Sequence, residues 1–296
     1  MTYIFYSKNA AGGRGMQQAL ALSKTIEGGA QIRALENFRL SDLFRVVTKQ
    51  DRVILLGGDG TINRLVNAPT MYPCTRNIFY APGGTGNDFY RDVRENEPSD
   101  IFPLTQYLQK LPTVKFGDRY LRFLNGVGFG LDGYACEVVN APTGRKKKSP
   151  SYALVAFKGL LWKFKPLNAT VTVDGVTHWF QDVFIATSMF GRYYGGGVKI
   201  APEQSRNETD SLSVVIAHGP RFAILPVFTK IFKGTHIQHK KYVTILHGNQ
   251  ITVKFDRACA MQVDGDVYPE ITSYTVTAPD PKQELAETEK EEAVQR

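Results

Sequence analysis

The sequence has few of the residues that build disulfide frameworks and metal clusters. Its 296 residues include three cysteines and five histidines. Because Cys74, Cys136 and Cys259 lie far apart and are odd in number, we expect neither a disulfide framework nor a zinc cluster. The scattered histidines have no spacing typical of a metal site.

Long apolar runs are also lacking. No uninterrupted run approaches the roughly 18 residues that a membrane-spanning helix requires. The opening residues, MTYIFYSKNAAGG, predict a short strand and a turn, without the basic and then apolar layout of a signal peptide. A hydrophobic content of 43% with 22% charged residues is typical of a soluble globular protein. We therefore expect a cytoplasmic protein.

Positive charge is in excess, with a net charge of +8. The last 17 residues, from Asp280, hold six acids and three bases, so the rest of the chain carries +11. Bases are densest in Arg145–Lys148 and alternate with aromatic residues in Trp162–Lys165. This combination favours transient contact with an anionic membrane surface. No nucleic-acid-binding signature accompanies it, so no nucleic acid partner is expected. A solvated basic loop with Trp162 in the core remains the alternative.

The pattern of the sequence predicts two domains. Residues 1–115 alternate short apolar runs with helical patterns, which predicts an α/β domain with a parallel sheet. Residues 116–278 are rich in β-branched segments of period two, which predicts a mostly antiparallel β-sandwich. The acidic tail, residues 279–296, is expected to be disordered or to pack back on the first domain. Helices are predicted near residues 16–26, 40–49, 152–165 and 222–233.

A glycine-rich turn, GGDGT, joins the apolar run Val53–Leu56 to an amphipathic helix. Thr61 is the expected N-cap of this helix. A strand-to-helix turn presents backbone N–H groups to an anion, and glycines let the backbone approach a phosphate closely. A carboxylate such as Asp59 beside phosphates indicates an intervening Mg²⁺. An ordinary turn that uses Asp59 for local hydrogen bonds is the alternative.

A second glycine-rich turn, GGTGNDF, follows the next predicted strand, Ile78–Ala81. Two such turns at one edge of a sheet can line one cleft. Together GGDGT and GGTGNDF resemble the nucleotide-binding motifs of the diacylglycerol kinase catalytic domain, in the family of bacterial soluble lipid kinases that also includes sphingosine and ceramide kinases. The resemblance extends to about residue 278. NAD kinases share GGDGT, but their pattern lacks GTGND.

Three further segments carry the resemblance. Asn125–Asp132 resembles the glycine-rich segment that enters the family's second domain. Asp210 begins a segment that resembles a metal-linked one, with Ser211 where glycine is usual. Met261–Asp266 resembles the family's DGE motif, with Asp266 in place of glutamate. The family's opening Asn-Pro is absent, and Ser7 and Lys8 stand in its place.

The resemblance implies a kinase that uses ATP and Mg²⁺ to phosphorylate a lipid hydroxyl, with diacylglycerol as the expected acceptor. Asp264 would accept the proton of that hydroxyl, and Asp59 would orient the metal or the reacting phosphate. Asp132 and Asp210 would hold Mg²⁺ or the loop that carries it. The expected ATP-binding residues are Gly57, Gly58, Gly60, Thr61, Gly84, Thr85, Gly86, Asn87, Asp88 and Lys8. The family's plan places ATP in the cleft between the two domains.

Several alternatives stay open. Asp88 could cap the helix that follows it, and Asp264 with Asp266 could simply build a hairpin turn. The loop Tyr193–Gly197, with Met189 and Phe190 nearby, is interpreted as an apolar-rimmed entrance for the lipid or as ordinary turn chemistry. The alternatives to a lipid kinase are another NAD-kinase-like small-molecule kinase and a non-catalytic, membrane-associated nucleotide-binding protein. Whether the chain forms a homodimer also stays open.

Overall fold

The structure is a computed structural model that describes residues 1–37, 47–48, 50–68, 77–97, 99–140, 152–206 and 211–279. Most of the predicted helix over residues 40–49, the basic run Arg145–Lys148, Asp210 and the acidic tail after Pro279 lie outside the described residues. The chain divides into two compact units, Met1–Leu111 and Pro112–Ala278. Each unit is described by itself.

The first unit contains a sheet of strand order β2-β1-β3-β4-β5, in which the first four strands are parallel and β5 is antiparallel to β4. Alternate residues of β1 and β3, including Ile4 and Ile54, enter one buried cluster with Ala19 of α2. Tyr3 and Val53, on the other face of the same strands, are buried as well. Both faces are therefore covered, as expected for parallel strands. The strands are β1 (Thr2–Tyr6), β2 (Gln31–Ala34), β3 (Arg52–Gly57), β4 (Ile78–Pro82) and β5 (Phe102–Pro103).

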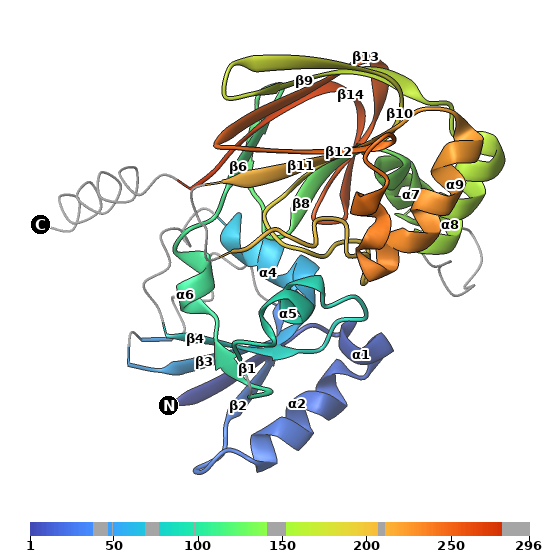
Figure 1. Ribbon diagram of the computed structural model, residues 1–296. Coiled ribbons are helices and arrows are strands. Elements are labelled where there is room, and N and C mark those ends of the chain that lie inside the picture. Colours follow the sequence, from blue (N-terminus) through green and yellow to red (C-terminus); the bar gives the residue numbers. More distant parts are fainter. Residues whose placement is uncertain are drawn as a thin grey trace, which may run out of the picture. The chain divides into compact units, whose positions relative to one another are not determined.

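Helices follow the strands of this sheet, as Figure 1 shows. The helix after β3 begins at Asp59, with Gly58 as its N-cap, so the predicted N-cap, Thr61, is wrong by three residues. The reason is that Gly58 is still extended and the helical conformation begins with the next residue. The helices are α1 (Ala10–Gly13), α2 (Gly15–Lys24), the 3-10 helix η1 (Leu35–Asn37), α4 (Asp59–Val66), α5 (Asp88–Val93) and α6 (Thr105–Leu108).

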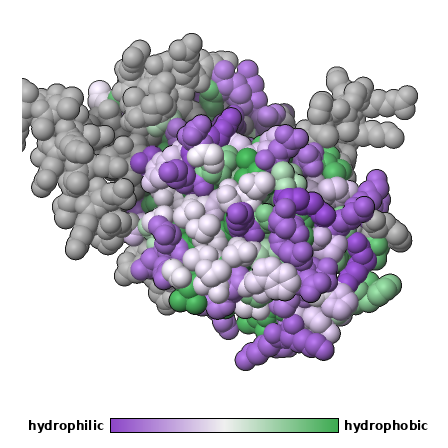
Figure 2. All heavy atoms as spheres, turned by 90° about the horizontal axis from the view of Figure 1, so that it is seen from above, coloured by the Kyte–Doolittle hydropathy of each residue, from purple (hydrophilic) through white to green (hydrophobic). Residues whose placement is uncertain are grey.

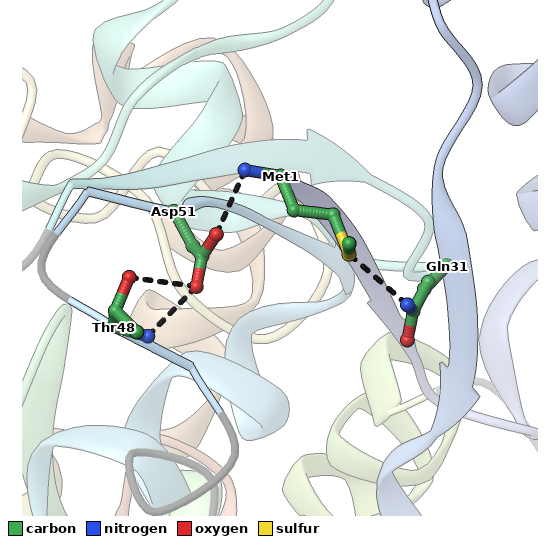
Figure 3. Close-up of polar contacts among 4 residues, drawn as sticks. All are labelled: Met1, Gln31, Thr48 and Asp51. Carbon is green, nitrogen blue, oxygen red and sulfur yellow. Dashed lines mark hydrogen bonds and ion pairs between the residues drawn. The ribbon is translucent and has the colours of Figure 1, made fainter.

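A carboxylate fixes the beginning of β1 beside the beginning of β3. Asp51 accepts hydrogen bonds from the Met1 ammonium at 2.8 Å and from the backbone N–H and hydroxyl of Thr48 at 2.8 and 2.9 Å (Figure 3). Gln31, at the start of β2, contacts the Met1 sulfur. The hydrogen bonds from Met1 and Thr48 lower the pKa of Asp51 to about 2. These contacts lie at the end of the sheet opposite to the glycine-rich turns.

The second unit contains a nine-stranded sheet in which every described strand pair is antiparallel. Its continuous path is β12-β11-β10-β8-β13-β14-β6-β7, and β9 pairs with β10 and β13. A domain boundary after residue 115, as the sequence predicts, would cut β6. The strands are β6 (Thr113–Phe116), β7 (Arg119–Arg122), β8 (Gly126–Gly130), β9 (Leu167–Val173), β10 (Val176–Met189), β11 (Leu212–His218), β12 (Val243–Gly248), β13 (Gln250–Val263) and β14 (Asp266–Thr277).

Two 14-residue strands, β10 and β13, organise this sheet. Their first halves both pair with β9, and their second halves both pair with β8. Register shifts separate the two halves, between Phe180 and Val183 in β10 and between Lys254 and Cys259 in β13. Irregularities of this kind bend a strand. Each long strand can therefore pair with β9 in one part of the sandwich-like domain and with β8 in another.

Helices of the second unit gather at one end of its sheet (Figure 1). The segment predicted as one helix over residues 152–165 is an α-helix that continues as a π-helical turn, and the segment 222–233 is an α-helix that ends in a 3-10 turn. Among the described residues, no helix is long and apolar enough to cross a membrane. The helices are α7 (Leu131–Asn140), α8 (Tyr152–Lys158), the π-helix η3 (Gly159–Lys163), α9 (Arg221–Lys230) and the 3-10 helices η4 (Ile231–Lys233) and η5 (Thr235–Gln238).

The predicted fold class is confirmed. The first unit is an α/β domain with a parallel sheet, and the second is a predominantly antiparallel, sandwich-like β domain. The predicted strands at Val53–Leu56 and Ile78–Ala81 are both present. Apolar runs and β-branched residues were sufficient to predict these strands, because the strands are buried as their sequences indicate.

Candidate functional site

The two glycine-rich turns lie side by side at the carboxyl ends of β3 and β4. The Gly83 N–H donates to the Gly57 carbonyl at 2.7 Å. A Cβ atom on Gly58 would lie 2.9 Å from the Gly84 Cα, and one on Gly84 would lie 2.6 Å from the Gly58 Cα. Any side chain at either position would push the turns apart. The buried Tyr80 hydroxyl also donates to Gly57 at 2.8 Å, and burial, with the nearby Asp59 carboxylate, raises the pKa of Tyr80.

Asp59 binds the two turns together through its carboxylate. One oxygen accepts the Asp88 N–H at 2.9 Å, and the other accepts the Phe89 N–H at 2.8 Å. These are the first two N–H groups of α5, which have no partner within the helix. The carboxylate that caps α5 is thus supplied by the neighbouring turn. The predicted contact of Asp59 with a metal or a phosphate stays a prediction.

Asn87 closes the second turn on itself. Its side-chain oxygen accepts the Gly84 N–H at 2.9 Å, and its side-chain nitrogen donates to the Gly84 carbonyl at 2.8 Å. The backbone of Asn87 has a φ of 52°, in the left-handed region that asparagine tolerates better than most residues. The sequence GTGN therefore produces a rigid loop with Thr85 exposed. Asp88 is buried as the first residue of α5.

This part of the first unit fits a phosphate group. Asp59 and Gly60 are the first residues of α4, so their N–H groups have no partner within that helix. Aligned N–H groups at a helix start attract anions. No Cβ atom narrows the approach at Gly60, which has open space around it. Thr61, in contrast, is buried.

The residues that replace the family's Asn-Pro follow β1. The Ser7 hydroxyl donates to the Glu36 carboxylate at 3.2 Å, and the Lys8 backbone N–H donates to the same oxygen at 2.7 Å. Lys8 is exposed. Its predicted phosphate contact stays a prediction.

In the second unit, Asp264 forms a two-residue hairpin turn between β13 and β14. Val263 pairs with Asp266, and both Asp264 and Gly265 have positive φ, 47° and 93°. This is the geometry in which Asp-Gly is favoured. The open question of whether these residues build a turn is thereby answered. Whether Asp264 is also a general base stays a prediction.

The half-buried carboxylate of Asp264 accepts three backbone N–H groups at the start of β8. Leu124 donates to one oxygen at 2.5 Å, and Asn125 and Gly126 donate to the other at 2.7 and 3.0 Å. The Asp264 N–H returns a bond to the Gly126 carbonyl at 3.0 Å. The Asp264 carboxylate is therefore held in a fixed position by the backbone.

Arg206 supports the same backbone segment from another side, and no sequence pattern predicted it. Its guanidinium donates to the Leu124 carbonyl at 2.6 Å and to the Asn125 side chain at 2.7 Å, and it lies over the Phe190 ring. The segment 124–126 thus contacts both Asp264 and Arg206. Only the tertiary structure brings these residues together, because they are more than 50 positions apart.

Asp132 is fully enclosed at the start of α7. Its carboxylate accepts the Thr187 hydroxyl at 2.7 Å and the Gly133 N–H at 2.9 Å. Burial raises its pKa to about 6, although these hydrogen bonds act in the opposite direction. Among the described residues, no group of three His, Cys, Asp or Glu side chains could hold a metal ion. The surroundings of Asp132 fit a buried, hydrogen-bonded carboxyl group better than a Mg²⁺ ligand, and Asp210 lies outside the described residues, so the predicted metal roles stay predictions.

The loop interpreted as a lipid entrance is a compact turn. Tyr194 and Val198 exchange backbone hydrogen bonds around three glycines of positive φ. Met189 and Phe190 are buried, so the expectation that they rim an opening is wrong. Met189 ends the central strand β10, whose last seven residues are all buried, and Phe190 follows it directly.

We predict that Asp59→Ala destabilises the first unit by about 1–3 kcal/mol, because two buried N–H groups of α5 lose their acceptor. Hydrogen exchange of the Asp88 and Phe89 amides should accelerate in the same variant. The measurements are urea unfolding and amide exchange of the full chain. Asp100→Asn, which changes an exposed carboxylate of the same unit, is the control. Unchanged exchange at both amides would contradict the capping role.

We predict that Asp132→Asn removes a pH-dependent loss of stability. The pKa of Asp132 rises from 3.8 to about 6 on folding, so its contribution is complete below about pH 4 and is lost as the pH rises through 6. The variant should therefore gain about 3 kcal/mol relative to the natural protein between pH 4 and pH 7, at 1.36 kcal/mol per pKa unit. Urea unfolding of both proteins across this range is the measurement. A constant difference would show that the carboxyl group is ionised throughout.

Two family models match the chain. The model described as "Diacylglycerol kinase catalytic domain" matches residues 4–113, and the one described as "YegS C-terminal NAD kinase beta sandwich-like domain" matches residues 125–281. The first match covers both glycine-rich turns, and the second covers the Asp264 hairpin.

Similar proteins agree with these matches. The chain is 24% identical to "Putative lipid kinase YtlR" of Bacillus subtilis over 79% of each chain. It is 27% identical to "Putative lipid kinase SAS0691" of Staphylococcus aureus over 73% of this chain and 71% of that one. A crystal structure titled as a putative diacylglycerol kinase from Bacillus anthracis has the same fold, with a TM-score of 0.64, 16% identity and coverage of 95% and 97% of the two chains. The chain therefore belongs to the family of bacterial lipid kinases that combine a diacylglycerol kinase catalytic domain with a YegS-type C-terminal domain.

Proposed function

We propose that this chain transfers the γ-phosphoryl group of ATP to the hydroxyl group of a lipid, with diacylglycerol as the expected acceptor. The observation that carries the proposal is the contact between the two glycine-rich turns, at which Gly58 meets Gly84 and Asp59 caps α5. Phosphoryl transfer depends mainly on positioning and charge neutralisation. A rigid cradle of backbone N–H groups meets the first of these needs.

The roles of the first unit follow from its contacts. The N–H groups at the start of α4 would bind phosphate oxygens, and Asn87 would keep the second turn in the shape that the nucleotide requires. Asp59 acts as a positioning residue, since its carboxylate is directed at the N–H groups of α5. Mg²⁺, when bound with ATP, would supply neutralisation of the phosphate charge. The exposed Lys8 would add a point charge for a phosphate.

The role of the second unit centres on Asp264. Its carboxylate is held by three backbone N–H groups. A carboxylate held in this way has a fixed direction, and a general base must lie within hydrogen-bond reach of the proton that it accepts. We therefore propose Asp264 as the acceptor of the lipid hydroxyl proton. Asn125 and Arg206 would hold the Asp264 carboxylate in place through the backbone segment directly before β8.

The proposal is tested by transfer of labelled phosphate from ATP to a panel of acceptors in mixed micelles with Mg²⁺. The panel contains diacylglycerol, phosphatidylglycerol, a sphingoid base and NAD⁺. Labelled phosphatidic acid would support the proposal as stated. Label on NAD⁺ alone would favour a small-molecule kinase, and bound ATP without any labelled product would favour a non-catalytic nucleotide-binding protein.

We predict that Asp264→Asn lowers phosphoryl transfer by about 10²- to 10⁴-fold, the usual contribution of a general base. Asparagine retains the turn preference and one acceptor oxygen, so ATP binding and folding should persist. The measurements are the rate of transfer, ATP affinity and thermal unfolding.

The matched control is Asp174→Asn. Asp174 and Gly175 form the same kind of turn between β9 and β10, with φ values of 47° and 87°. The Asp174 carboxylate likewise accepts backbone N–H groups, from Asn249 and Gln250. Both variants should lose similar stability, but only Asp264→Asn should lose transfer. Equal rates in the two variants would exclude Asp264 as the base.

A further inference from the structure

Gln262 of β13 is a polar side chain buried inside the second unit. On the face of the molecule that Figure 2 shows, hydrophilic and hydrophobic residues are intermixed, and water can serve as the partner of polar groups there. Gln262, in contrast, is 2% exposed. Burial of an amide group without hydrogen bonds costs about 1–3 kcal/mol. The contacts at the two ends of this side chain therefore matter to the fold.

The oxygen end of Gln262 holds the turn that carries Asp264. Its Oε1 atom accepts the Gly265 N–H at 2.9 Å, so a side chain of the strand clamps the turn that follows it. The matched turn between β9 and β10 has Thr172 at the same position. The Thr172 hydroxyl instead contacts Thr177 across its hairpin at 3.0 Å. The glutamine clamp therefore distinguishes the Asp264 turn from its structural counterpart.

The nitrogen end of Gln262 belongs to a row of residues across three strands. Gly128 of β8 pairs with Gln262 of β13 on one side and with Thr187 of β10 on the other. Side chains of directly paired residues lie on the same face of a sheet. On this face a Cβ atom at Gly128 would collide with the Asp132 carboxylate and with the Thr187 hydroxyl. The space that glycine leaves free is thus filled by Asp132, with Gln262 as a neighbour in the row.

Asp132 reaches this row because the chain reverses directly after β8. Gly130 has a φ of 102°, which favours glycine, and α7 begins at the next residue. The Gln262 amide nitrogen is buried and has no hydrogen-bond partner among the described residues. Gln262 nevertheless lies close enough to Asp132 to oppose the rise in the pKa of that carboxyl group. The carboxylate of Asp132 is therefore the acceptor that this row offers to the amide.

We propose that Gln262 is a positioning residue for the Asp264 carboxylate, because its amide links Asp132 to the backbone of the turn. The amide nitrogen donates to the Asp132 carboxylate, and the amide oxygen accepts the Gly265 N–H. Glutamine suits this position because its side chain is both a donor and an acceptor. The link supports the turn from a second side, in addition to the backbone N–H groups that Asp264 itself accepts. The inference rests on the proposed function, in which Asp264 is the general base.

The test is Gln262→Met, which keeps the side chain long and removes both of its hydrogen-bonding ends. The kcat for phosphoryl transfer to diacylglycerol should fall about 10- to 100-fold, since misplacement of a reacting group by about 1 Å can cost about 100-fold. The KM for ATP should stay within about twofold. Amide exchange at Gly265 and Leu124 should accelerate. An unchanged kcat would overturn the inference even if thermal stability falls, because a purely structural glutamine affects stability alone.

Exchange of the amide and the carboxylate tests the partner of Gln262. Gln262→Glu alone places two carboxyl groups beside each other and should lower kcat at least as far as Gln262→Met. Addition of Asp132→Asn returns one amide and one carboxylate to the pair, and should recover at least about tenfold of the lost kcat. Thermal unfolding checks that both variants fold. No recovery in the folded double variant would overturn the link to Asp132.

Tyr274→Phe is the matched control. The Tyr274 side chain is buried as deeply as Gln262, and its hydroxyl contacts Ser188 at 3.0 Å. Ser188 follows Thr187 in β10 and therefore lies on the opposite face of the strand. The control removes a buried polar contact that does not reach the Asp264 turn, so its kcat should stay within about twofold. Equal losses of kcat in Tyr274→Phe and Gln262→Met would overturn the positioning role.

Amide exchange separates this inference from the proposed function, because it requires no reaction. Faster exchange at Gly265 and Leu124 in Gln262→Met, together with no phosphoryl transfer by the natural protein to any acceptor, would support the link and overturn the proposed function. Natural exchange at both amides in Gln262→Met, together with phosphorylation of lipid by the natural protein, would do the reverse.

Discussion

The carboxylate of Asp59 is the constraint on which the first unit's site depends. Gly58 and Gly84 approach so closely that no side chain fits between them, and the two hydrogen bonds that the N–H groups of α5 donate to Asp59 hold that approach in place. The glycines alone would give two separate flexible turns, because glycine loses more conformational freedom on folding than any other residue. The aspartate converts them into one cradle. Its position in GGDGT is thereby explained by the backbone that it binds.

The second unit uses the same chemistry at a hairpin turn. Asp174 and Asp264 share a positive φ, a following glycine and a carboxylate that accepts backbone N–H groups from a neighbouring strand end. The Asp174 turn shows that this arrangement has a structural value without any reaction. What distinguishes Asp264 is its surroundings, since two of its partners, Leu124 and Asn125, lie directly before β8 and are also bound by Arg206. A turn that stabilises the sheet can in this way also fix the direction of a carboxylate, as the proposed role of Asp264 as a general base requires.

The charged groups in the interior of the second unit differ from those at its helical end. Asp132 is a carboxyl group whose burial raises its pKa to about 6, held among Thr187 and backbone N–H groups. The exposed lysines at the helical end, such as Lys163 and Lys233, are the opposite case, because no carboxylate forms an ion pair with them among the described residues. Buried carboxyl groups act through hydrogen bonds and burial, whereas exposed lysines act on large charged partners through long-range attraction.

The sequence alone determined the fold class and the positions of the two glycine-rich turns after β3 and β4, because strand period, β-branching and glycine each act on the local backbone. The start of α4, the burial of Met189 and Phe190 and the enclosure of Asp132 were decided by tertiary structure. The same holds for the partners of Asp59 and Asp264 and for the packing of α9 against α8 and η3. These features depend on which backbone N–H groups and side chains meet across long separations in the chain. Periodicity carries no information about such meetings, because it records only the neighbours of a residue along its own helix or strand.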